Sequence, residues 1–86
     1  MSFTPLPPLP EEFRVLSMMH NIGAISSERS LTADELAQWT GIEVSIVKAY
    51  LQKLREDGYV EFVQIDGMEK YHTTRTGIMK VLTLYS

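Results

Sequence analysis

The side chains that could do covalent or metal chemistry are few in this 86-residue sequence, and they are not grouped. There is no cysteine, which excludes disulfide bonds, thiolate nucleophiles and cysteine-based zinc sites. His20 and His72 lie far apart, and no cluster of metal ligands accompanies them. Serine and threonine are plentiful, but no spacing suggests a nucleophile with a histidine base and an acid. We therefore expect a binding protein and no enzyme, with no catalytic residue, metal or cofactor.

The charged side chains decide whether nucleic acid is a plausible ligand. Eight lysine and arginine residues stand against eleven aspartate and glutamate residues, for a net charge of −3. Dedicated nucleic-acid binders are usually basic, because phosphate contacts supply much of their affinity. Lys48, Lys53 and Arg55 could also be no more than the solvated face of an amphipathic helix. An acidic protein can nevertheless carry a local positive stripe, so the net charge alone does not exclude DNA.

Length and composition predict one small globular domain. Hydrophobic residues make up 44% of the chain and charged residues 22%, which is ordinary for such a domain. A chain of this size has room for one modest core and little for a deep catalytic cleft. No apolar run approaches the roughly 20 residues that cross a bilayer, and the N-terminus lacks the features of a signal peptide. We expect a cytoplasmic protein with no membrane partner.

All four prolines lie within residues 1–10. Because proline fixes φ and removes a backbone donor, this segment is predicted to be an extended leader that frays or lies across the domain. It contains two overlapping Pro-x-x-Pro patterns, without a basic residue before them. The folded domain is expected to span residues 11–86.

Three helices are predicted in the first two thirds of the chain, from apolar residues at intervals of three and four. The first spans 11–21, the second 33–40 and the third 43–57, and a glycine that can end the helix follows each one. Thr32 and Glu35 form a capping box at the start of the second helix. The residues expected to face the core in the third helix are Val47, Tyr50, Leu51 and Leu54.

After the third helix the apolar pattern becomes alternating, which is typical of strands. Residues 59–73 predict a hairpin of two strands, because Asp66-Gly67 at its centre is a strong two-residue turn. Thr74 can cap a last helix over about 75–85. Ile25, in the polar connection after the first helix, is a candidate for a short strand that pairs later.

With its elements in this order, the chain resembles the winged-helix superfamily over about residues 11–86. The helix-turn-helix resemblance rests on Leu31-Thr32-Ala33-Asp34-Glu35-Leu36-Ala37, Thr40-Gly41-Ile42 and Val47-x-x-x-Leu51-x-x-Leu54-x-x-x-Gly58-Tyr59-Val60. The string Tyr71-His72-Thr73-Thr74-Arg75-Thr76-Gly77 is similar to the Tyr-x-Leu-Thr-x-x-Gly that follows the wing in many small bacterial and archaeal regulators, with Thr73 in place of leucine.

The resemblance implies an α+β, mostly α architecture with a three-helix core, a β-hairpin wing and a C-terminal helix. Within it, the helix-turn-helix would span about 32–57, the wing about 59–73 and the last helix about 75–85. The helix 43–57 would then enter the DNA major groove, and the wing would touch phosphate or the minor groove.

The DNA-binding residues that the resemblance implies are Ser45, Lys48, Gln52, Lys53, Lys70 and Arg75. In the wing, Asp66 and Glu69 oppose the contribution of Lys70. In the family, the first and last helices commonly form a homodimer, and both helices carry apolar side chains on more than one face here. The expected dimer or partner contacts are Met18, Trp39, Ile78, Leu82 and Tyr85.

Two functions therefore stay open. The first is a sequence-specific, dimeric transcriptional regulator that binds double-stranded DNA. The second is a winged-helix module that binds a protein and no DNA. The acidic balance, the absence of arginine from the groove-facing positions and a partly exposed Trp39 favour the second function. Alternatively, Phe3, Leu6 and Leu9 of the leader could pack over Trp39.

Overall fold

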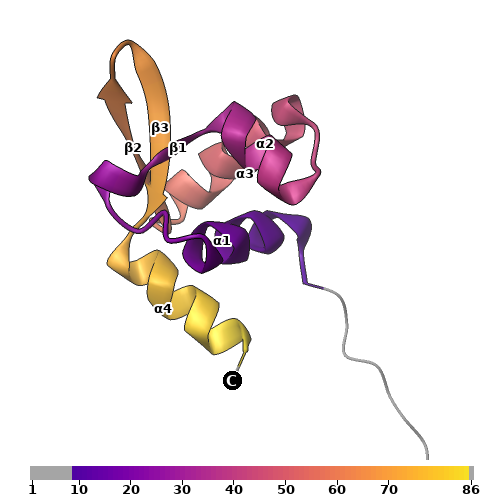
Figure 1. The fold of residues 1–86 in the computed structure, drawn as a ribbon. Coiled ribbons are helices and arrows are strands. Elements are labelled where there is room, and N and C mark those ends of the chain that lie inside the picture. The colour runs from indigo at the N-terminus through magenta and orange to yellow at the C-terminus, as the bar shows by residue number, and fades with distance from the viewer. Residues whose placement is uncertain (1–8, 86) are drawn as a thin grey trace, which may run out of the picture.

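A computed structural model describes residues 9–85 (Figure 1). Its elements in chain order are α1 (Glu11–Asn21), a 3-10 turn η1 (Ser27–Arg29), β1 (Leu31–Thr32), α2 (Ala33–Thr40), α3 (Val44–Glu56), β2 (Val60–Ile65), β3 (Met68–Thr73) and α4 (Arg75–Leu84). The four predicted helices and the two predicted hairpin strands are all confirmed, with ends that differ by one residue at most. Most of the predicted leader lies outside the described residues.

The local signals for the start of α2 and for the hairpin turn are confirmed in detail. The Thr32 hydroxyl accepts from the Glu35 amide at 3.1 Å, and the Glu35 carboxylate accepts from the Thr32 amide at 3.0 Å. Asp66 and Gly67 have φ values of 53° and 78°, as a two-residue hairpin turn with the right-handed twist requires. Glu35 therefore fixes where α2 begins, and the Asp66-Gly67 turn fixes the register of β2 with β3.

The sheet has three antiparallel strands in the order β1-β3-β2, and its third strand is not where the sequence suggested. Leu31 pairs with Tyr71, whereas Ile25 forms no strand and is 46% exposed. The connection after α1 touches the sheet one residue earlier, where the Ala24 carbonyl accepts from the Thr73 amide at 2.8 Å. The suggestion of a strand at Ile25 was wrong because the 3-10 turn intervenes, and the chain becomes extended again just before the helix cap.

The core lies where the four helices meet the base of the hairpin. Its fully buried side chains are Val15, Leu16 and Met19 from α1, Leu36 from α2, Val47, Leu51 and Leu54 from α3, and Val81 from α4. Figure 1 shows α1 across the centre, with α4 on one side of it and the hairpin projecting beyond the helices on the other side. Within residues 9–85, no helix has the length and hydropathy that a membrane-spanning segment needs.

The hairpin and α4 approach each other closely where they join. The Thr74 amide donates to the Tyr59 carbonyl at 3.0 Å, and the Thr74 hydroxyl accepts from the Gly77 amide at 3.0 Å. A Cβ atom on Gly77 would lie 2.1 Å from the Tyr59 carbonyl oxygen. The glycine in the string that follows the hairpin is therefore required by this close backbone approach.

Gly77→Ala should lower the free energy of unfolding by about 3 kcal/mol, because backbone atoms cannot move aside as a flexible side chain can. Urea denaturation followed by circular dichroism measures the change. The control is Thr76→Ala on the exposed side of the same turn, which should change stability by less than about 0.5 kcal/mol. Equal effects of the two variants would contradict the close approach.

Candidate nucleic-acid interface

Helix α3 presents a polar face to solvent opposite its buried stripe. Val47, Leu51 and Leu54 are 0% exposed, whereas Lys48, Gln52 and Arg55 are exposed. These three residues follow one another at intervals of four and three, so they share one side of the helix. The side chains of Lys48, Gln52 and Arg55 are turned toward the hairpin, because all three line a space that β3 also lines.

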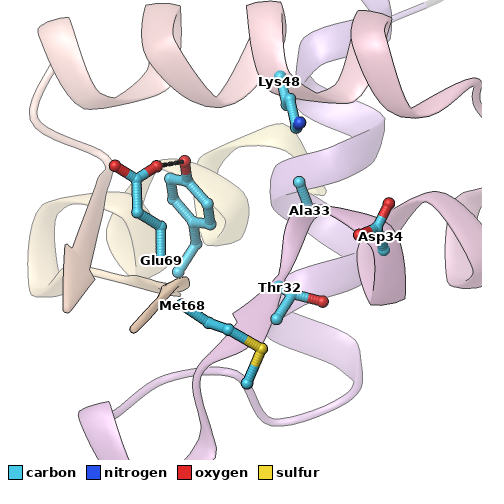
Figure 2. Close-up of a pocket in the computed structure, with 7 residues that line it drawn as sticks. Thr32, Ala33, Asp34, Lys48, Met68 and Glu69 are labelled. Carbon is cyan, nitrogen blue, oxygen red and sulfur yellow. Dashed lines mark hydrogen bonds between the residues drawn. The ribbon is translucent and has the colours of Figure 1, made fainter. Parts of the chain in front are cut away.

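That space is a groove between α3 and β3. One part of it, with a volume of about 330 Å³, is lined by Lys48, Gln52, Arg55, Glu69 and Tyr71. A second part of about 260 Å³ shares Lys48, Glu69 and Tyr71 and continues toward the start of α2, where Asp34 lies (Figure 2). Because the two parts share three residues, we treat them as one surface and call it the α3–β3 groove.

An acid and a phenol face the α3 side of this groove. The Tyr71 hydroxyl donates to Glu69 Oε2 at 3.0 Å, and this hydrogen bond is the dashed line at Glu69 in Figure 2. Tyr71 is 8% exposed, so its ring is held by the core. Burial raises the pKa of Tyr71, and the hydrogen bond to Glu69 and the negative charge of Glu69 raise it further. The positive charge of Arg55 lowers the same pKa.

Arg55 is fixed by an aromatic ring of the neighbouring strand. Its guanidinium carbon lies 4.1 Å from the centroid of the Phe62 ring, which is the geometry of a cation–π contact. Phe62 in turn packs on Tyr71, with ring centroids 6.1 Å apart. The resemblance places Arg55 only at the flank of the DNA contact, but its helical spacing from Lys48 and Gln52 puts it on the same face of α3.

No protein-family model and no curated protein matches the chain. Solved structures do. The DNA-binding TubR fragment from Clostridium botulinum is 21% identical, with a TM-score of 0.77 and coverage of 92% of this chain and 99% of that one. A candidate DNA-binding protein from Ralstonia eutropha JMP134 is 18% identical, with a TM-score of 0.76 and coverage of 93% and 100%.

A longer protein shares the same arrangement. A MarR family transcriptional regulator from Silicibacter pomeroyi is 22% identical, with a TM-score of 0.71 over 86% of this chain and 48% of that one. The chain has the winged helix-turn-helix fold. Helices α2 and α3 are the helix-turn-helix and β2–β3 is the wing, so the predicted architecture is confirmed.

Two of the predicted DNA contacts already have partners within the winged helix. The Ser45 hydroxyl donates to the Glu43 carboxylate, which also caps α3. Lys53 Nζ lies 3.0 Å from Glu12 Oε1 of α1, and this hydrogen bond raises the pKa of Lys53. A DNA phosphate would have to compete with a carboxylate at both places, and the contacts of Ser45 and Lys53 with DNA stay predictions.

Two further predicted contacts lie away from the α3–β3 groove. Lys70 stands between Glu69 and Tyr71 in the sequence, but successive side chains of a strand point to opposite faces, and Lys70 does not line the groove. Arg75 is the first residue of α4, at the base of the wing. The structure therefore brings Lys48 and Gln52 together with Arg55, and separates them from Lys70 and Arg75.

The side chains predicted to contact a partner differ in exposure. Trp39 of α2 is 57% exposed, and Leu82 and Tyr85 at the end of α4 are 58% and 66% exposed. Met18 and Ile78 are half-buried. The outer side of α4 also carries the exposed Met79. An apolar surface therefore lies along α4.

Titration of Tyr71 tests the geometry of the groove without DNA. We expect its pKa to lie above the usual 10.0, and Glu69→Gln to lower it, because the variant removes a negative charge and a strong acceptor. Residue-specific NMR of labelled tyrosine measures both pKa values, with Glu61→Gln, on the same hairpin, as the control.

The folded state holds the proton of the Tyr71 hydroxyl more tightly than the unfolded chain does. The free energy of unfolding should therefore fall as the pH rises from about 10 toward the folded pKa. A Tyr71 pKa that does not respond to Glu69→Gln would rule out the contact.

Proposed function

We propose that this protein is a DNA-binding transcriptional regulator that places α3 in the major groove of duplex DNA and the wing beside it. The observation that carries the proposal is the exposed row of Lys48, Gln52 and Arg55 on α3, next to the wing. The likeness to the DNA-binding TubR fragment and to a MarR family regulator supports it. A location in the cytoplasm would follow from this function.

The three residues have different chemistry toward DNA. The Gln52 amide can both donate and accept, which suits the N6 and N7 atoms of adenine. Lys48 can donate to guanine or to a phosphate. The Arg55 guanidinium has five donors and is already oriented by Phe62, so it suits a phosphate at the edge of the contact. Gln52 would therefore read a base, Lys48 would contact a base or a phosphate, and Arg55 would position the helix.

Loss of single side chains on α3 should weaken DNA binding. Lys48→Ala should lower the affinity for duplex DNA about tenfold at low salt and reduce the salt slope by about one. Gln52→Ala should lower the affinity about fivefold and leave the slope unchanged, because the amide is neutral. Fluorescence anisotropy with labelled duplex over a range of salt concentrations measures both quantities.

The control for this titration is Lys80→Ala, which removes the same charge from α4. Lys80 Nζ lies 5.1 Å from the centroid of the Phe13 ring, on the α1–α4 side of the fold. Equal losses for Lys80→Ala and Lys48→Ala would mean that net charge and not the α3 face determines affinity. A folded protein that binds no duplex at low salt would contradict the proposed function.

We further propose that the regulator is a homodimer through α1 and α4. Leu82, Tyr85 and Met79 expose a contiguous apolar side of α4 that its own core does not use. Met18 of α1 and Ile78 of α4 would extend this surface. A two-fold pair would present two α3 helices to successive half-sites of DNA.

Leu82→Glu should raise the dimer dissociation constant at least about tenfold, because it places a charge in the apolar contact. The fold should persist, since Leu82 is 58% exposed in the single chain. Sedimentation equilibrium measures the mass, with Gln38→Glu on the exposed side of α2 as the control of equal charge. A wild-type protein that stays monomeric at high concentration would overturn the dimer.

The exposed Trp39 favours a second candidate function, which is a protein-interaction module without DNA binding. Trp39 is 57% exposed on α2, and Ile46 on α3 is 42% exposed. Tryptophan is enriched at the centres of protein interfaces. The alternative that leader residues cover Trp39 involves Phe3, Leu6 and Leu9. Phe3 and Leu6 lie outside the described residues, and Leu9 is 38% exposed. Absence of DNA binding in the titration above would favour this second function.

A further inference from the structure

We propose that Glu69 is a specificity-determining residue of the DNA interface, whose carboxylate accepts a hydrogen bond from the N4 amino group of a cytosine. The inference rests on the proposed DNA-binding function. It adds a base contact from the wing side of the α3–β3 groove, made in the DNA major groove that α3 would occupy, whereas the resemblance implies only phosphate or minor-groove contacts for the wing. It assigns a base-reading role to Glu69, which by its charge alone would only oppose the contact of Lys70 with phosphate.

The first observation is the place of the carboxylate. Glu69 lines both parts of the α3–β3 groove, opposite Lys48 in one part and opposite Lys48 and Arg55 in the other. These are the cations that the proposed function uses. An acid at this position weakens their attraction for phosphate, because like charges repel and the phosphate oxygens offer no proton to accept.

The second observation is that the carboxylate is held in place. Its Oε2 atom accepts from the hydroxyl of Tyr71, whose ring is 8% exposed and packs on Phe62. A buried phenol therefore fixes the carboxylate at the surface of the groove (Figure 2). Among the described residues, Oε1 receives no hydrogen bond, and it is available as an acceptor for a ligand.

The chemistry of a fixed carboxylate selects the base. An ionised carboxylate accepts only, so it can pair only with a donor on a base edge. In the major groove the N4 amino group of cytosine is such a donor without a neighbouring acceptor on the same base. Adenine also offers an amino group, but its adjacent N7 acceptor would face the carboxylate and repel it, whereas the Gln52 amide can satisfy both atoms. Cytosine is therefore the base that Glu69 favours.

Glu69→Gln separates this role from a general charge effect. The glutamine can still accept from Tyr71, so the hairpin should keep its structure, and circular dichroism with thermal unfolding checks this. The matched control is Glu61→Gln, which removes the same charge from the same hairpin. Glu61 is 66% exposed, lies 3.8 Å from His72 and does not line the α3–β3 groove.

The experiment has two readouts on the full-length chain. The first is the affinity for a pool of random-sequence duplexes at low salt, where Glu69→Gln should bind about fivefold more tightly than wild type and Glu61→Gln should differ by less than about twofold. The second is selection from the same pool followed by sequencing. Wild-type protein and Glu61→Gln should enrich cytosine at one position of the site, and Glu69→Gln should lose that enrichment.

The other possible results show whether the role of Glu69 alone is wrong or the proposed function fails as well. If wild type binds salt-dependently but shows no such cytosine, or if Glu69→Gln keeps it, the role of Glu69 is wrong and the proposed function stands. If Glu69→Gln and Glu61→Gln raise the affinity for DNA equally, the effect is one of net charge, and the role of Glu69 is wrong. If Glu69→Gln does not raise the affinity, the carboxylate does not face the DNA, and the role of Glu69 is wrong as well. If folded wild type binds no duplex, both the proposed function and this inference fail.

Discussion

Helix α3 can bury only one side, and the side chains of Val47, Leu51 and Leu54 determine which side that is, since each is fully buried. Removing one such side chain from a core typically costs about 2–5 kcal/mol, so the helix cannot rotate without a large loss of stability. The wing is fixed beside α3 by the stacking of Arg55 on Phe62 and, at its base, by the close contact of Gly77 with Tyr59. The polar face of α3 and its distance from the wing follow from these contacts.

The polar face that results is unusual for a proposed DNA contact, because carboxylates accompany its donors. Glu43 holds the hydroxyl of Ser45, and Glu12 holds the ammonium group of Lys53. Glu69 shares the groove with Lys48 and Arg55. Such a surface gains little from general attraction to phosphate, which provides most non-specific affinity. Recognition on the proposed interface would therefore depend on base edges and on the shape of the duplex.

The sequence predicted the elements well because their signals are local. The capping box at Thr32, the Asp66-Gly67 turn and the apolar spacing of α3 each act within a few residues, and all are present in the structure. The short strand at Leu31 was missed because its partner, Tyr71, lies 40 residues away, and nothing local distinguishes it from the end of a loop.

The candidate site was harder to predict, for the same reason. The partners of Lys53 and Tyr50, which are Glu12 and Glu11, lie on another helix, 41 and 39 residues away. Which wing residues face α3 depends on the pleat of the hairpin, which places Glu69 in the groove and Lys70 outside it. Arg55 could have been found from its spacing along α3, but its stacking on Phe62 requires the packed structure.

The most direct measurement of the central claim is an NMR titration of the isotope-labelled protein with a duplex selected from a random pool. A DNA interface on α3 predicts that the largest amide shift changes fall on residues 45–56 and on β3 around Glu69, with small changes along α4. Shift changes confined to α4 or to the surroundings of Trp39, or no changes at all, would contradict it.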